Sequence, residues 1–141
     1  MSDKQLVTIL IPVHNEEDNI PLLIKRLSKT VSALPMFDFE ALFVDDGSTD
    51  NTLKMIEQYA DGGLAVGYLK LSKNFGHQAA LEAGLQHASG GIVISMDGDL
   101  QHPPEMIPKM LEEYSKGADV VQMQRSNTAS DFKGFLSVLS V

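Results

Sequence analysis

The chain has 141 residues, 43% of them apolar and 21% charged, which is enough for one globular domain with its own core. Its formal charge of −8 at pH 7 argues against a nucleic-acid partner, because nucleic-acid backbones select basic surfaces. The absence of cysteine excludes disulfides and Cys-ligated metals. The sequence also lacks a run of 18 apolar residues, the length that a membrane-spanning helix needs, so we expect a soluble chain.

The first half of the chain predicts strands that alternate with helices. Residues 6–13 are rich in β-branched side chains and predict a buried strand. Apolar residues at helical spacing then predict a helix over residues 20–34. A second strand is predicted at residues 41–44, a second helix at residues 52–60, and a third strand at residues 65–71.

The second half continues this alternation. Small residues predict a helix over residues 79–88, and a continuous apolar run predicts a strand over residues 92–96. A helix over residues 104–114 and a strand over residues 118–123 follow. The apolar tail at residues 134–141 fits either a peripheral strand or the start of a segment that has been removed. Short apolar strands separated by helices indicate an α/β fold, a mostly parallel sheet with helices on both faces.

In a sheet of this kind, ligands bind at the carboxyl ends of the strands. The unusual polar segments of this chain follow the predicted strands, at residues 12–16, 45–48, 73–77 and 97–101. We therefore expect the functional site to form where these four segments meet.

The sharpest motif is Asp97-Gly98-Asp99, directly after an apolar strand. Two carboxylates at a strand end can share one hard cation, and Mg²⁺ commonly binds one or two carboxylates together with substrate phosphates. Gly98 leaves room for close approach of a ligand to the backbone. Taken alone, the tripeptide fits an acidic turn better, but the buried strand before it favours a metal site.

The other segments have both a structural and a functional interpretation. Asp45 and Asp46 can accept hydrogen bonds from a base or a ribose, or can belong to a turn in which Asp50 caps the next helix. His14 can stack beside a base or hydrogen-bond to it, although a polar loop that caps the next helix explains that segment better when it is taken alone. Lys73 offers a cation to a phosphate just before a helix N-terminus, where anions are favoured, or lies in a solvated loop.

Four segments in this order resemble family 2 glycosyltransferases with the metal-dependent, nucleotide-binding fold. They are IPVHNEEDNI, VDDGSTDNT, LSKNFGHQAALEAGL and MDGDLQHPPE. The last two are most similar to the branch that transfers a sugar to a polyprenyl phosphate, such as dolichyl-phosphate mannose synthases and undecaprenyl-phosphate glycosyltransferases. The resemblance covers residues 6–125 and implies a Rossmann-like glycosyltransferase A-type fold.

The resemblance and the residue chemistry together assign a candidate site. We expect the nucleotide sugar to be bound by Pro12, His14, Glu16, Val44, Asp45, Asp46, Lys73, Asp97, Gly98, Asp99 and Arg125. The implied ligands of Mg²⁺ or Mn²⁺ are Asp97, Asp99 and Gln101, and Asp97 and Asp99 are the expected catalytic residues.

The implied reaction is an inverting transfer from a nucleotide-diphosphate sugar to a polyprenyl phosphate. We favour a UDP-sugar over GDP-mannose as the donor. The chain is expected to be one catalytic domain, residues 1–141, of a longer protein that works at the cytoplasmic face of the membrane. By itself it should bind the donor but transfer sugar poorly. Its oligomeric state is left open, with a homo-oligomer among the options.

Three other functions share some of these features. A signalling receiver domain is also acidic and binds magnesium through paired Asp residues, but its acidic pair follows the first strand. A Rossmann dehydrogenase needs a Gly-rich turn after the first strand, which this chain lacks. A catalytically silent nucleotide-sugar-binding module would differ from the enzyme only in turnover.

Overall fold

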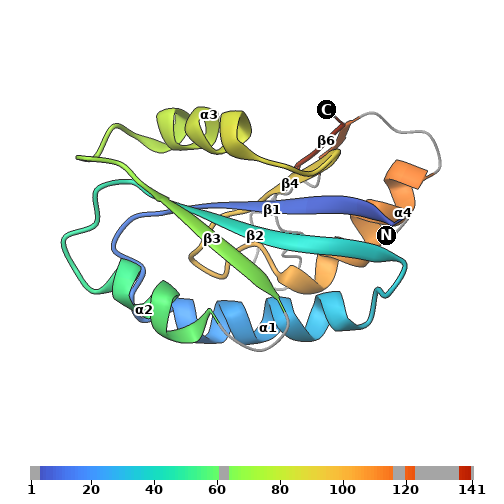
Figure 1. The fold of residues 1–141 in the computed structure, drawn as a ribbon, viewed down its shortest axis with the longest axis horizontal. Helices are drawn as coiled ribbons and strands as arrows, with labels where there is room; N and C mark the ends of the chain where they lie inside the picture. The colour runs from blue at the N-terminus through green and yellow to red at the C-terminus, as the bar shows by residue number, and fades with distance from the viewer. Residues whose placement is uncertain (1–3, 61–63, 116–119, 123–136, 141) are drawn as a thin grey trace.

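The computed structural model describes residues 4–60, 64–115, 120–122 and 137–140, which form a sheet flanked by helices (Figure 1). In chain order the elements are β1 (Gln5–Val13), α1 (Ile20–Ser32), β2 (Phe37–Asp45), α2 (Thr52–Tyr59), β3 (Ala65–Lys70), α3 (His77–His87), β4 (Ile92–Ser95), the 3₁₀ helix η1 (Pro104–Met106), α4 (Ile107–Ser115), β5 (Val120–Gln122) and β6 (Ser137–Ser140). The strand order in the sheet is β3-β2-β1-β4-β6-β5.

The predicted mostly parallel sheet is confirmed. Strand β1 pairs in parallel with β2 and β4, and β2 pairs in parallel with β3. Strand β2 begins at Phe37 rather than at residue 41, because it pairs with the whole length of β1, starting with Gln5 opposite Phe37. Of the two alternatives for the tail, the strand is confirmed for residues 137–140, but its expected peripheral position is wrong. Strand β6 lies between β4 and β5 and is antiparallel to both, so the hydrogen bonds of two neighbours hold it inside the sheet.

Alternate residues of the strands build two separate cores, one on each face of the sheet. On one face, Val7, Ile9 and Ile11 of β1 are fully buried in the larger core, together with apolar residues of α1, α2 and α4. On the other face, Leu10 packs in a smaller core with Ala80 of α3. Figure 1 shows α3 on the opposite side of the sheet from α1 and α2. The prediction of helices on both faces is therefore confirmed.

Helix α3 lies close to the sheet because one of its residues is a glycine. A Cβ at Gly84 would lie 2.1 Å from Cδ1 of Leu10, far inside van der Waals contact. Packing thus explains why α3 contains small residues, as expected from the sequence, since a larger side chain would push α3 away from β1.

The carboxyl ends of the parallel strands remain in register up to the loops that follow them. The backbone N–H of Asp46 donates to the Val13 carbonyl at 2.9 Å, and that of Met96 donates to the Leu10 carbonyl at 3.0 Å. On the other side of β2, the Leu71 N–H donates to the Asp45 carbonyl at 2.9 Å. The loops after β1, β2, β3 and β4 therefore start at one edge of the sheet. In the described part of the chain, no helix is both long enough and apolar enough to cross a membrane.

Candidate functional site

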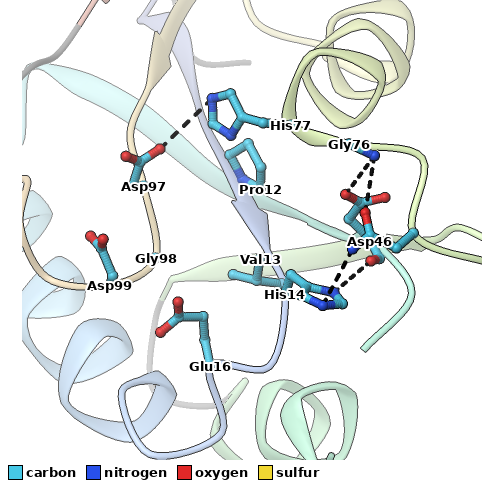
Figure 2. Close-up of a pocket in the computed structure, with 11 residues that line it drawn as sticks. Pro12, Val13, His14, Glu16, Asp46, Gly76, His77, Asp97, Gly98 and Asp99 are labelled. Carbon is cyan, nitrogen blue, oxygen red and sulfur yellow. Dashed lines mark hydrogen bonds and ion pairs between the residues drawn. The ribbon is translucent and has the colours of Figure 1, made fainter. Parts of the chain in front are cut away.

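A pocket of about 300 Å³ opens at this edge of the sheet (Figure 2). Its residues come from the four loops in which the sequence analysis placed the site. They are Pro12, Val13, His14, Glu16, Asp46, Asn74, Gly76, His77, Asp97, Gly98 and Asp99. Figure 2 shows Asp97 and Asp99 on one side of the pocket and His14 with Asp46 on the other, with Pro12 and Val13 between them.

Most of the expected site residues line this pocket, and the others lie outside its lining. The Val44 side chain is fully buried in the smaller core beneath α3. Asp45 is also buried, and its Oδ1 accepts the N–H of Ser48 at 3.1 Å. Lys73 and Gln101 are exposed but do not line the pocket. Arg125 lies outside the described residues.

The loop after β1 is fixed to the loops that follow β2 and β3. The Nδ1 atom of His14 lies 2.8 Å from the Asp46 carbonyl, and because a carbonyl only accepts, Nδ1 donates. The other ring nitrogen, Nε2, lies 3.4 Å from the side-chain amides of both Asn15 and Asn74, which can donate to it. Asn15 has a positive φ of 52°, and its Oδ1 accepts the Thr49 N–H at 2.8 Å. These bonds fix one ring tautomer of His14 and the orientation of its ring.

The Asp46 carboxylate holds the start of α3. Its Oδ1 accepts the backbone N–H of Phe75 at 2.8 Å, and its Oδ2 accepts that of Gly76 at 3.0 Å. The residue is 5% exposed, yet it lines the pocket. A carboxylate has about four lone-pair directions, so Asp46 keeps the capacity to accept further hydrogen bonds from a ligand.

Gly47 lets the β2 loop pass directly over the β3 loop. It has a φ of +69°, and a Cβ there would lie 2.4 Å from the backbone of Lys73 and of Asn74. Beyond this contact, the Lys73 ammonium lies 5.1 Å from the centre of the Phe75 ring, within the range of a cation–π contact. The two loops therefore form one wall of the pocket.

The loop after β4 carries the acidic pair. The Asp97 carboxylate lies between two histidines, with Oδ1 at 3.9 Å from Nε2 of His77 and Oδ2 at 3.8 Å from Nε2 of His102. The Asp99 Oδ1 accepts the Gln101 N–H at 3.0 Å, which closes a tight turn. A Cβ at Gly98 would lie 2.6 Å from Cγ1 of Val13. The glycine therefore lets the loop pack against β1, a reason that the sequence analysis did not anticipate.

The donor set of this loop fits a hard divalent cation that is shared with a ligand. Asp97, Asp99 and Gln101 offer only oxygen donors, the type that Mg²⁺ and Mn²⁺ prefer. Among the described residues, no group of three or more His, Cys, Asp or Glu side chains is arranged to hold a metal by itself. A coordination shell of two carboxylates, water and substrate phosphates is the kind that Mg²⁺ usually adopts.

Three polar residues near the pocket were not among the site residues expected from the sequence. Asn74 and His77 line it, and the buried His102 lies against Asp97. Both Asn74 and His77 belong to residues 73–77, one of the four segments expected to form the site. The sequence does not show in which direction the side chain of a single polar loop residue points. His102 follows the acidic pair by only a few residues, and that spacing was the one available signal.

Comparison with known proteins identifies the family of this chain. Residues 8–136 match the family model of glycosyl transferase family 2. The undecaprenyl-phosphate 4-deoxy-4-formamido-L-arabinose transferase of Pseudomonas fluorescens (strain SBW25) is 41% identical over 123 residues. That match covers 86% of this chain and 36% of the relative, so the chain spans just over a third of the relative's length.

Solved structures share the fold. The mannosyltransferase PcManGT from Pyrobaculum calidifontis, in complex with GDP-Man and Mn²⁺, superposes with a TM-score of 0.77 at 21% identity, over 99% of this chain and 45% of that one. TarS 1–349 of S. aureus in complex with UDP-GlcNAc gives a TM-score of 0.68 at 26% identity, over 86% of this chain and 35% of that one. The expected α/β fold is thus confirmed.

Proposed function

Since this chain belongs to glycosyl transferase family 2, we propose that it binds the sugar donor in a metal-dependent transfer to a polyprenyl phosphate. Family membership removes the receiver-domain and dehydrogenase alternatives. The identity with an undecaprenyl-phosphate transferase supports a polyprenyl phosphate as acceptor. The acceptor, the sugar and the activity of the whole protein belong to this proposal, because the matched region is 36% of the relative.

One observation carries the proposal: the acidic pair and the His14–Asp46 pair face each other across a single pocket (Figure 2). A nucleotide sugar has a polar base and ribose at one end and a diphosphate at the other. The His14–Asp46 side offers a fixed ring and carboxylate oxygens for the nucleoside. The Asp97–Asp99 side offers the oxygen donors that a diphosphate-bound cation requires.

The proposed chemistry needs little from a general base. A phosphate monoester has a second pKa of about 6, so its oxygen is already largely ionised at neutral pH and is a ready nucleophile. A bound divalent cation supplies charge neutralisation for the departing nucleoside diphosphate. Asp97 and Asp99 would hold that cation, and the loops after β1 and β2 would hold the nucleoside so that the sugar faces the acceptor in line. Displacement in one step inverts the anomeric carbon.

A uridine nucleotide remains our preferred donor. The NFGHQAAL segment is most similar to the bacterial polyprenyl-phosphate enzymes, many of which use one. TarS 1–349, at 26% identity, binds UDP-GlcNAc, whereas PcManGT, at 21% identity, binds GDP-Man. Neither likeness fixes the base, so a direct competition between UDP and GDP has to decide it.

Transfer can be tested in a chimera in which this chain replaces the matching segment of the Pseudomonas fluorescens relative. The assay offers a panel of labelled nucleotide sugars and a short polyprenyl phosphate, with Mg²⁺ or Mn²⁺. Donor binding by the chimera shows that it has folded. We expect transfer with inversion of the anomeric carbon, and no transfer in the Asp97→Asn chimera.

Two results would contradict parts of this proposal. Donor binding without transfer in the folded chimera would favour the catalytically silent module. Retention of anomeric configuration in the product would rule out direct displacement by the lipid phosphate.

A further inference from the structure

Asp97 lies between two histidines, of which His102 is buried and His77 is exposed. The His102 side chain is 4% exposed and its Nε2 lies 3.8 Å from Oδ2 of Asp97. The His77 side chain is 59% exposed and its Nε2 lies 3.9 Å from Oδ1. His77 faces the pocket, whereas His102 approaches Asp97 from the protein interior.

The second contact of His102 is with the backbone of the same residue. The Asp97 N–H donates to Nδ1 of His102 at 2.9 Å. Nδ1 therefore accepts and carries no proton in this arrangement, so a neutral ring has its proton on Nε2, the atom that faces the Asp97 carboxylate. One imidazole thus contacts Asp97 at its backbone through Nδ1 and at its side chain through Nε2–H.

The loop that presents Asp97 and Asp99 needs such support because part of its backbone is strained. Leu100 has a φ of +65°, a conformation that is unfavourable for a bulky side chain. The Leu100 side chain packs against the larger core, and the Asp99–Gln101 bond closes the turn. The Asp97–His102 bond joins the two ends of residues 97–102, which make up most of the loop between β4 and η1.

We propose that His102 is a positioning residue, which fixes the backbone of Asp97, and with it the place of the carboxylate, for a divalent cation without binding the cation itself. The proposal rests on the proposed function for the presence of that cation. Side chains that hydrogen-bond to metal ligands commonly change metal affinity about 10- to 100-fold when they are replaced. The geometry here gives two separable contacts, so each can be removed in turn.

Two substitutions separate the contacts. His102→Asn places an amide oxygen near the position of Nδ1 and can still accept the Asp97 N–H. His102→Gln places its amide near the position of Nε2 and leaves the Asp97 N–H without that acceptor. With the 141-residue chain and UDP present, calorimetry should show a Mn²⁺ affinity about tenfold weaker in His102→Gln and within about threefold of the parent in His102→Asn.

Two controls distinguish positioning from general loss of stability. Gly84→Ala disturbs packing on the opposite side of the sheet, and it should lower the melting temperature without changing Mn²⁺ affinity. His87→Gln alters an exposed histidine of α3 and should change neither quantity. In the metal-free parent, NMR of the imidazole nitrogens should show Nδ1 of His102 unprotonated, and the Asp97 amide should exchange faster in His102→Gln than in the parent.

The outcomes are distinct. Parent-like Mn²⁺ affinity in His102→Gln, or an equal loss in Gly84→Ala, would overturn the positioning role while leaving the proposed function intact. A protonated Nδ1 in the parent would overturn it as well. A parent chain that binds no Mn²⁺ with either UDP or GDP would instead overturn the proposed function, and the cation role of His102 with it.

Discussion

The carboxylate of Asp46 accepts the backbone N–H of Gly76 at 3.0 Å, which ties the end of β2 to the first turn of α3. The same carboxylate accepts the Phe75 N–H at 2.8 Å. A residue expected to contact the nucleotide therefore also builds the wall against which that nucleotide would lie. The motif that contains Asp46 has a structural role beside its proposed binding role, and the two can be separated experimentally.

Asp46→Asn should destabilise the fold by about 1–3 kcal/mol, because the amide replaces one acceptor oxygen with a donor that faces a backbone N–H. Urea unfolding gives the free energy, and hydrogen exchange should show faster exchange at Phe75 and Gly76. Asp45→Asn is the matched control, since the Asp45 carboxylate accepts the Ser48 N–H, a bond that the Asn oxygen can keep. Equal stability of the Asp46 variant and the parent would show that the two bonds to the start of α3 contribute little.

Gly84→Ala should cost about 1–3 kcal/mol of unfolding free energy, because the added methyl overlaps Leu10. Gly67→Ala on β3 is the control, since no atom lies within 4 Å of its added Cβ, and it should be neutral or mildly stabilising. Thermal unfolding of both variants measures the difference. If the two variants have the same melting temperature, the close approach of α3 to β1 does not limit stability.

The ion pair between α1 and η1 predicts a pH dependence of stability. Arg26 donates through Nε to Oε2 of Glu105 at 3.0 Å and through Nη2 to Oε1. The Arg26 hydrogen bond lowers the pKa of Glu105. A lowered folded-state pKa means that the pair stabilises the protein above the unfolded glutamate value of about 4.3, and that this contribution is lost as the pH falls through the folded value.

Since both side chains are partly exposed, the expected contribution is at most about 1 kcal/mol. Glu105→Gln should therefore be less stable than the parent at pH 7, and the difference should disappear as the pH falls through the lowered folded pKa of Glu105. Arg26→Gln should show the same pH profile, and the double variant should be no less stable than either single variant. A Glu105→Gln deficit that persists unchanged at low pH would contradict the ion-pair explanation.

The donor base is tested by competition. UDP should displace a fluorescent nucleotide-diphosphate probe more strongly than GDP does, with Mn²⁺ held constant. Asn74→Ala, which removes a pocket-lining amide near His14, should weaken both nucleotides if this side of the pocket holds the nucleoside. Tighter binding of GDP than of UDP would overturn the preference for a uridine donor.

The sequence predicted the layered α/β fold because apolar runs and helical periodicity depend on local burial, which repeats along the chain. It missed the start of β2, where residues 37–40 are only partly buried and so lack a continuous apolar signal. It placed the tail at the periphery, because the position of a short strand depends on its partners, β4 and β5, rather than on its own residues.

The sequence predicted the position of the candidate site from the motifs that directly follow predicted strands. Most of the selected residues line one pocket because parallel strands bring their carboxyl ends together. The bonds of Asp46 to the β3 loop and the burial of His102 could not be predicted, since each depends on a contact between segments whose relative orientation the sequence does not encode locally. Val44 shows the reverse: it belongs to the motif, yet its side chain faces the core.

The most direct test of the central claim is calorimetry of UDP binding to the 141-residue chain, with and without Mn²⁺. We expect binding that depends on Mn²⁺ and an affinity at least tenfold weaker in Asp99→Asn, a loss of about 1.4 kcal/mol. Glu82→Gln, an exposed charge change on α3 outside the pocket, should bind as the parent does. Metal-independent binding in the parent, or undiminished affinity in Asp99→Asn, would contradict the assignment of the acidic pair to a cation-bound diphosphate.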